Sequence, residues 1–134
     1  MNKKIIFTNG CFDIIHLGHL QLLNFCKKLK GKVIVGINSD KSVKHLKGNN
    51  RPINKEKYRK NFLEELNVVD KVVIFNELTP INLIKKIKPN IIVKGNDYKK
   101  KDVVGYHEIK KWNGEVIIFK KKNKNSTSKI LKKI

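Results

Sequence analysis

The 134-residue sequence contains few cysteines and few aromatic residues, and it has no long apolar run. Two cysteines, Cys11 and Cys26, provide neither the disulfide framework of a small secreted domain nor a C-x-x-C redox motif, so both are expected to be reduced thiols. No stretch approaches the roughly 20 apolar residues of a membrane span. Met1-Asn2-Lys3-Lys4 leads directly into an apolar run and does not resemble a secretory signal. We therefore expect a cytoplasmic protein that does not associate with membranes.

Arginine is also scarce, although the formal net charge is +20. Arg51 and Arg59 are the only arginines, and lysine supplies the remaining positive charge in a sequence that is also rich in asparagine and isoleucine. An AT-rich genome imposes such a composition on tolerant surface positions. Because the few aromatic residues form no stacking platform, a nucleic-acid-binding function is not favoured. The positive field would still attract anionic small molecules.

Short apolar runs alternate regularly with segments of helical periodicity. Five runs are typical of buried strands, at residues 5–7, 32–37, 71–75, 91–93 and 115–119. Helices are expected over residues 17–29, 54–66, 79–88 and 105–112 and from residue 126 onward, with residues 40–50 a loop or frayed helix. Continuous apolar strands alternating with helices are typical of a parallel sheet covered on both faces. The sequence thus predicts a single α/β domain over residues 1–134, built on a Rossmann-like, doubly wound parallel sheet of about five strands.

Polar residues gather where these predicted strands end. Residues 9–19 follow the first strand, Ser39-Asp40 the second, residues 94–97 the fourth and residues 126–129 the fifth. In doubly wound sheets, ligands bind beyond the carboxyl ends of the strands, where the strand order reverses. These four segments are therefore expected to meet at one rim of the sheet.

The first of these segments joins a strand to a helix and has the features of an anion site. Asn9-Gly10 is a turn dipeptide, and Gly10 lets the backbone approach a ligand closely. The unpaired N–H groups and the dipole at the start of the following helix attract phosphates. His16 and His19, three residues apart, can face the same anion. A zinc site is not favoured, because the pair lacks the glutamate of H-E-x-x-H and no further ligands lie nearby.

Four ordered segments resemble a known family. They are Asn9-Gly10-Cys11-Phe12-Asp13-x-x-His16-x-Gly18-His19, Leu46-Lys47-Gly48-Asn49-Asn50-Arg51-Pro52, Val93-Lys94-Gly95-Asn96-Asp97-Tyr98 and Ser126-Thr127-Ser128-Lys129-Ile130. Together they are similar to the nucleotidyltransferase superfamily with the H-x-G-H motif, specifically to its cytidylyltransferase-like branch. Within that branch, they look like the adenylyltransferase domains of bacterial ADP-heptose synthases. The similarity spans essentially the whole chain.

The resemblance implies nucleotidyl transfer from ATP to a sugar phosphate of the heptose 1-phosphate type, with release of pyrophosphate. It implies catalytic roles for His16, His19 and Lys47. The two histidines would also bind the nucleotide, together with Asn9, Gly10, Cys11, Phe12, Asp97, Ser126, Thr127 and Ser128. Phosphates or the acceptor would be bound by Lys47, Arg59 and Lys129. Mg²⁺ would be held chiefly by phosphate oxygens and water rather than by side chains, and related enzymes are usually homodimers.

Two alternatives remain open at this point. The same chemistry could use CTP and make a CDP-polyol such as CDP-glycerol, because the choice of base rests on backbone contacts that the sequence does not reveal. A nucleic-acid-binding or non-catalytic nucleotide-sensing domain is a more distant alternative, which the intact histidine pair argues against.

Overall fold

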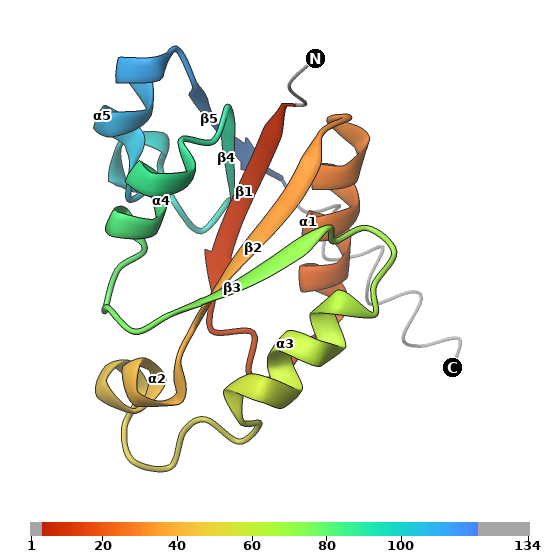
Figure 1. Ribbon diagram of the computed structural model, residues 1–134, viewed down its shortest axis with the longest axis vertical. Coiled ribbons are helices and arrows are strands. Elements are labelled where there is room, and N and C mark those ends of the chain that lie inside the picture. The colour runs from red at the N-terminus through yellow and green to blue at the C-terminus, as the bar shows by residue number, and fades with distance from the viewer. Residues whose placement is uncertain (1–3, 121–134) are drawn as a thin grey trace.

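A computed structural model describes residues 4–120 and shows the predicted α/β architecture. Its five strands all run parallel in one sheet with the order β3-β2-β1-β4-β5. The strands are β1 (Ile5–Gly10), β2 (Lys32–Asn38), β3 (Lys71–Phe75), β4 (Ile91–Gly95) and β5 (Glu115–Phe119). The chain first builds the sheet outward from β1 through β2 to β3 and then returns to the other side of β1 (Figure 1). The doubly wound Rossmann-like fold is therefore confirmed.

Five α-helices connect these strands. They are α1 (Leu17–Lys28), α2 (Asp40–Lys47), α3 (Glu56–Glu64), α4 (Ile81–Ile87) and α5 (Tyr106–Ile109), with 3-10 turns at Lys100–Asp102 and Lys110–Trp112. The expectation of a loop or frayed helix after β2 needs refinement, because α2 is a regular helix whose N-cap Ser39 accepts a hydrogen bond from the Ser42 N–H. The helix predicted from residue 126 lies outside the described residues. No helix within residues 4–120 has the length and apolarity to cross a membrane.

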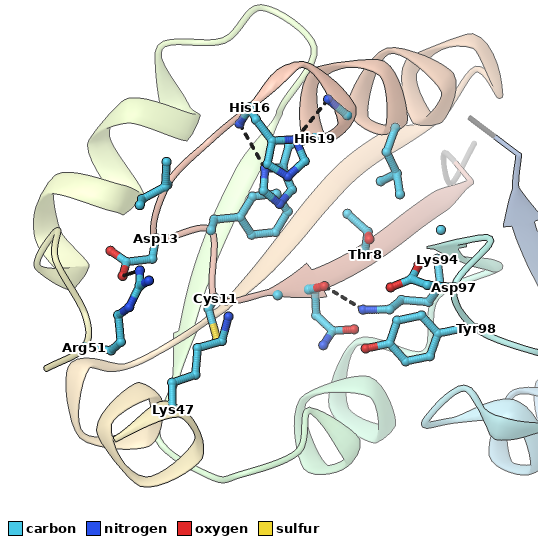
Figure 2. A pocket seen from close by; sticks show the side chains of 17 residues that line it. Thr8, Cys11, Asp13, His16, His19, Lys47, Arg51, Lys94, Asp97 and Tyr98 are labelled. Carbon is cyan, nitrogen blue, oxygen red and sulfur yellow. Dashed lines mark hydrogen bonds and ion pairs between the residues drawn. The ribbon is translucent and has the colours of Figure 1, made fainter. Parts of the chain in front are cut away.

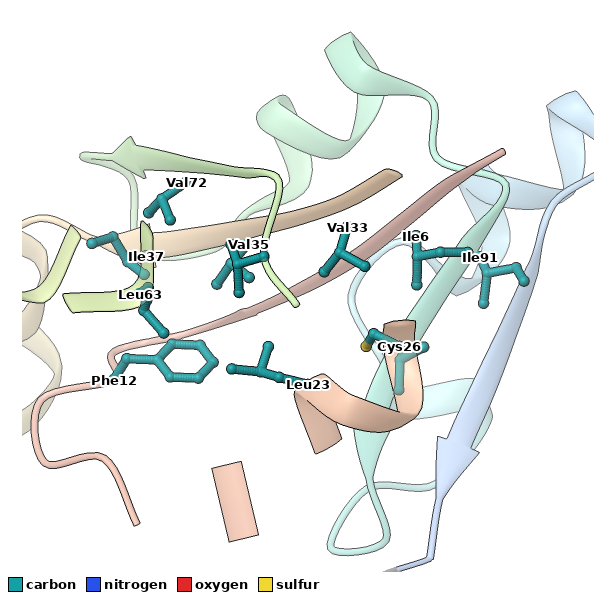
Figure 3. Packing of buried hydrophobic residues seen from close by; sticks show 12 residues of the cluster. Ile6, Phe12, Leu23, Cys26, Val33, Val35, Ile37, Leu63, Val72 and Ile91 are labelled. Atoms are coloured by element: carbon teal, nitrogen blue, oxygen red, sulfur yellow. The ribbon is translucent and has the colours of Figure 1, made fainter. Parts of the chain in front are cut away.

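Two apolar layers cover the sheet, because successive side chains of a strand point to opposite faces. On β1, Ile6 packs into one layer and Phe7 into the other. The first layer includes Leu23 of α1 and Leu63 of α3 and is shown in Figure 3. The second includes Ile84 of α4. Helices on both faces leave the carboxyl-terminal edge of the sheet to the connecting loops.

At that edge, β1 pairs very differently with its two neighbours. Its register with β2 runs over six residues, from Ile5↔Lys32 to Gly10↔Ile37. With β4 it pairs only at Ile6↔Ile91 and Phe7↔Ile92. The ends of β1 and β4 therefore separate, at the point where the order of the sheet reverses. This is where doubly wound sheets bind ligands.

Candidate active site

A cleft of about 430 Å³ lies at the carboxyl ends of β1 and β4 (Figure 2). Eight of the residues that the sequence predicts as site residues line it, namely Asn9, Gly10, Cys11, Phe12, His16, His19, Lys47 and Asp97. They come from the β1–α1 junction, the end of α2 and the loop after β4. The predicted Ser126, Thr127, Ser128 and Lys129 lie outside the described residues.

His16 and His19 form a reciprocal cap at the start of α1. Nδ1 of His16 accepts a hydrogen bond from the Gly18 N–H at 3.1 Å, and Nδ1 of His19 accepts one from the His16 N–H at 3.2 Å. Because Nδ1 accepts in both rings, each neutral imidazole carries its proton on Nε2. The rings are stacked, with centroids 3.9 Å apart. The cap therefore fixes two imidazoles as Nε2–H donors beside the N-terminus of a helix, which attracts anions.

Phe12 packs against the histidine pair from the core. Its ring is buried in the core and lies 5.0 Å from the ring of His19, centroid to centroid. Its backbone has φ = 48°, a left-handed conformation that few non-glycine residues adopt and that the surrounding structure must stabilise. A Cβ on Gly10 would lie 3.2 Å from the Phe12 ring, so Gly10 provides space for it. Phe12 thus contributes to the site by packing.

Asp13 joins the β1–α1 junction to the segment that follows α2. Its carboxylate accepts hydrogen bonds from the N–H groups of Ile53 (2.8 Å) and Asn54 (2.7 Å) and pairs with Arg51 at 3.3 Å. The residue is only 6% exposed. Lys47, the last residue of α2, and Arg51, within this segment, both line the cleft. Asp13 therefore anchors the basic side of the cleft to the histidine junction.

We predict that Asp13→Asn destabilises the protein at neutral pH and that its effect fades in acid. Burial raises the pKa of Asp13, but the hydrogen bonds from Asn54 and Ile53, with Arg51, together lower it below the ordinary value of 3.8. A carboxyl group with a lower pKa in the folded state stabilises the protein above its unfolded-state pKa and loses this effect as the pH falls through the folded-state pKa. Urea unfolding at neutral pH should show a loss of about 1–3 kcal/mol, since a buried N–H loses its partner.

The pH series provides the control for this prediction. The difference in unfolding free energy between wild type and Asp13→Asn should shrink as the pH falls below 3.8, the ordinary pKa of an aspartate. Asp102→Asn, at an exposed aspartate, should leave the unfolding free energy within about 0.5 kcal/mol of wild type. A difference for Asp13→Asn that stays constant with pH would contradict a role for its ionised carboxylate.

Arg59 has a different place from the predicted one. It is 1% exposed and is not among the residues that line the cleft. Its guanidinium donates to the carbonyls of Asn54 (2.8 Å), Cys11 (2.8 Å) and Asn38 (2.7 Å) and pairs with Asp40 at 2.9 Å. With these donors engaged, Arg59 holds together the ends of β1, β2 and the following helices. These contacts give Arg59 a structural role, and its binding of phosphates stays a prediction that this burial does not favour.

The loop after β4 forms the opposite wall. Lys94, Asp97 and Tyr98 line the cleft there (Figure 2). A Cβ on Gly95 would lie 2.9 Å from Oδ1 of Asp97, so a side chain at this position would displace the carboxylate. Gly95 therefore leaves room for the Asp97 carboxylate in its observed position, where it can accept hydrogen bonds from the hydroxyl groups of a ligand.

Sequence reasoning did not assign a role in the site to Asp13, Arg51, Lys94 or Tyr98, all of which line the cleft. The sequence signal that could have identified these four residues is their position inside the segments that carry the family resemblance. Their contacts depend on which segments the fold brings together, and periodicity does not reveal this. Arg51 provides an example, because its guanidinium meets a carboxylate 38 residues earlier in the chain.

Few side chains of the cleft could act as ligands for a metal ion. Within residues 4–120, no three histidine, cysteine or acidic side chains gather as a group that could hold a metal. Asp13 is engaged with residues 51–54, which leaves Asp97 as the other carboxylate of the cleft. This donor set fits Mg²⁺ only where phosphate oxygens and water supply most of its ligands.

Comparisons with known proteins identify the family of this chain. The cytidylyltransferase-like family model matches residues 7–133. The bifunctional protein HldE of Campylobacter jejuni is 53% identical over 99% of this chain, and that of Campylobacter fetus is 49% identical over 98%. The chain spans only 28% of the length of either relative.

Among solved structures, a lipopolysaccharide core biosynthesis protein of Thermoplasma volcanium superposes with a TM-score of 0.72 at 30% identity, covering 89% of this chain and 96% of that one. A pantothenate synthetase of Thermus thermophilus shares the fold, with a TM-score of 0.65 at 14% identity over 93% of this chain and 58% of that one. The family model, the relatives and the histidine cap at the strand-to-helix junction lead to one assignment. This chain belongs to the cytidylyltransferase-like family.

Proposed function

We propose that this protein transfers the adenylyl group of ATP to a sugar phosphate of the heptose 1-phosphate type. The observation that carries the proposal is the pair of imidazoles fixed as Nε2–H donors at the N-terminus of α1, inside a cleft that also presents Lys47 and Arg51. The relatives named HldE, about half identical over the whole chain, favour ATP and a heptose phosphate over CTP and a polyol phosphate.

In this reaction, a phosphate oxygen of the acceptor attacks the α-phosphorus of ATP. A new P–O bond forms, the bond from the α-phosphorus to the bridging oxygen breaks, and pyrophosphate leaves with the electron pair. Catalysis of this kind depends on alignment and on stabilising the charge of the transferred group. His16 and His19 donate hydrogen bonds to the phosphates, and Lys47 supplies positive charge from the end of α2. Asp97 binds a ribose hydroxyl group.

Three further elements belong to the proposal. Mg²⁺ accompanies the triphosphate and neutralises part of its charge, held mainly by phosphate oxygens. Ser126, Thr127, Ser128 and Lys129 bind the β- and γ-phosphates. The enzyme acts in the cytoplasm as a homodimer.

The proposal is tested by incubating the purified protein with Mg²⁺, each nucleoside triphosphate and a panel of sugar and polyol phosphates, and by measuring pyrophosphate. We expect release with ATP and a heptose 1-phosphate and the matching ADP-sugar by mass spectrometry. Release with CTP and glycerol 3-phosphate would replace the proposal with the polyol alternative. Absence of pyrophosphate with every pair would refute nucleotidyl transfer.

Thiol labelling is expected to report nucleotide binding independently of turnover. Cys11 lines the cleft and is partly exposed, whereas Cys26 is completely buried and burial raises the pKa of its thiol to about 12. Thiolate is the reactive form, so a mild alkylating agent should label Cys11 alone. Saturating Mg-ATP should slow this labelling several-fold, measured by peptide mass spectrometry.

The specificity of this protection can be checked in the same experiment. Cys11→Ser should abolish labelling of the folded protein, which confirms the site of modification. Labelling of Cys11 that proceeds equally fast with and without saturating Mg-ATP would contradict a nucleotide in the cleft.

A further inference from the structure

Lys94 bridges the gap that opens between β1 and β4. The two strands pair last at Phe7↔Ile92, and no backbone pairing is recorded between them beyond that point. Two residues farther along each strand, Nζ of Lys94 donates a hydrogen bond to the carbonyl oxygen of Asn9 at 2.9 Å. Figure 2 shows this side chain reaching across the cleft wall from β4 to β1. The ammonium group therefore lies in the crevice where the order of the sheet reverses.

The surroundings of this ammonium group are unusual for a lysine. It lies 4.7 Å from the centroid of the Tyr98 ring, and within residues 4–120 it forms no ion pair with a carboxylate. Burial lowers the pKa of Lys94 to about 8, while the nearby Asp97 and Cys11 act to raise it. A partly buried ammonium group that forms no close ion pair is costly. An anionic ligand at this point would offset that cost.

Only one of the three N–H donors of the ammonium is accounted for by Asn9. Lys94 also lines the cleft, together with the histidine pair and Lys47. The exposed Lys47 reaches the cleft from α2, whereas Lys94 approaches from the opposite, β4 side (Figure 2). The cleft thus has a cation on each side, and the family resemblance assigned a role to only one of them.

We propose that Lys94 binds a phosphate group of a ligand in the cleft, while it keeps its hydrogen bond to the Asn9 carbonyl. This inference rests on the proposed nucleotidyl transfer for the identity of the ligand. The phosphate belongs either to the nucleotide or to the acceptor, and both offer the same oxygen acceptors. In either case Lys94 supplies charge-assisted hydrogen bonds from the end of β4 and fixes the phosphate relative to β1.

Lys94→Gln is the most informative variant, because its amide can still donate to Asn9 but carries no charge. Calorimetric titration with ATP, adenosine and the best acceptor phosphate of the panel separates the possible sources. A loss of about tenfold or more in affinity for ATP, with adenosine unaffected, identifies a nucleotide phosphate. A comparable loss confined to the acceptor identifies the acceptor phosphate. Unchanged affinity for both phosphate ligands, or an equal loss for ATP and adenosine, overturns the proposal.

Two further variants control for charge and for folding. Lys101→Gln removes one positive charge at an exposed position of the following turn and should leave all three affinities unchanged. Lys94→Arg retains a charged donor and should retain most of the affinity for the phosphate ligand. If Lys94→Gln fails to fold, Lys94→Arg is compared with wild type at rising pH. Its affinity should hold where that of wild type declines, and parallel declines overturn the proposal.

The lowered pKa of Lys94 predicts how the affinity for the phosphate ligand depends on pH. A lysine with a pKa of about 8 is protonated below this value, so affinity for the phosphate ligand should be highest there and should decline as the pH rises. Wild type should show this decline and Lys94→Gln should not. The other titratable groups that line the cleft are common to both proteins and cancel in the comparison, namely Cys11, Asp13, His16, His19, Lys47, Asp97 and Tyr98.

Tripolyphosphate distinguishes failure of this inference from failure of the proposed function. Wild type that binds tripolyphosphate more tightly than Lys94→Gln, but binds no nucleoside triphosphate, would sustain the role of Lys94 and refute nucleotidyl transfer. Equal binding of ATP and of the acceptor phosphate by both proteins would refute the role of Lys94 and leave the proposed function intact. Wild type that binds no phosphate ligand would refute both.

Discussion

Replacing His19 by alanine is expected to lower kcat for pyrophosphate release by about 10²-fold or more, the usual effect of removing a preorganised donor from the site of a developing charge. His16→Ala should have an effect of the same order. The physical reason is that a backbone N–H holds Nδ1 of each ring, and in the proposed reaction Nε2–H donates to the phosphates. Because these donors act on the transition state, kcat should fall more than the affinity for ATP.

Two substitutions separate the capping role of His19 from its role as a donor. In His19→Asn, the amide oxygen can take the place of Nδ1 and accept from the His16 N–H, but no group replaces Nε2. In His19→Gln, the amide nitrogen lies near the place of Nε2. Activity should therefore stay low in the asparagine variant and recover in part in the glutamine variant. Activity close to that of wild type in the asparagine variant would mean that the ring acts only as a cap.

His107→Ala provides the matched control for the histidine variants. His107 is exposed on α5 and is not among the residues of the cleft, so its loss should leave kcat within about twofold of wild type. His16→Ala should also lower the free energy of unfolding by about 1 kcal/mol, because it removes the N-cap of α1. Activity of both His16→Ala and His19→Ala close to that of wild type would place the chemistry elsewhere.

The sequence predicts the scaffold well because its strands are continuous apolar runs that only a doubly covered parallel sheet can bury. It also predicts the histidine pair, since both residues belong to one local strand-turn-helix junction. The regular α2 was not predicted, because its polar sequence conceals Val43, which is fully buried in the folded chain. Val43 is buried by packing against segments that are distant in the sequence. The hydrophobic periodicity of an eight-residue helix is too short to predict this burial.

The two arginines show that the functional role of a residue can also depend on contacts that the sequence alone does not reveal. From the sequence, Arg51 precedes the helix predicted over residues 54–66 and Arg59 lies within it, and the family resemblance implies the phosphate role for Arg59. In the structure Arg51 lines the cleft, and Arg59 is buried under it. The difference depends on the carbonyl groups of Cys11 and Asn38, which lie 48 and 21 residues away and reach Arg59 only when β1 and β2 are paired. Placing Arg51 in the cleft and Arg59 beneath it therefore required the tertiary fold.

This difference between the arginines predicts that Arg59→Met lowers the free energy of unfolding by about 3–5 kcal/mol, the usual cost of breaking a buried ion pair by removing one partner. The substitution leaves the Cys11 and Asn38 carbonyls without their donor and Asp40 without its cation. Arg59→Lys should recover only part of this loss, because one ammonium cannot reproduce the planar fork of contacts. Urea unfolding followed by circular dichroism measures both variants.

Arg51→Met is the matched control, because it makes the same change at the other arginine. The Arg51 side chain is 39% exposed and contacts Asp13 at 3.3 Å, so its removal should cost less than about 1 kcal/mol. The two variants should also differ in function. Arg51→Met should keep its fold and bind phosphate ligands more weakly, whereas Arg59→Lys should lose stability first and affinity only as the ends of β1 and β2 loosen. If both methionine variants lost stability equally, the carbonyl groups around Arg59 would not be the source of its effect.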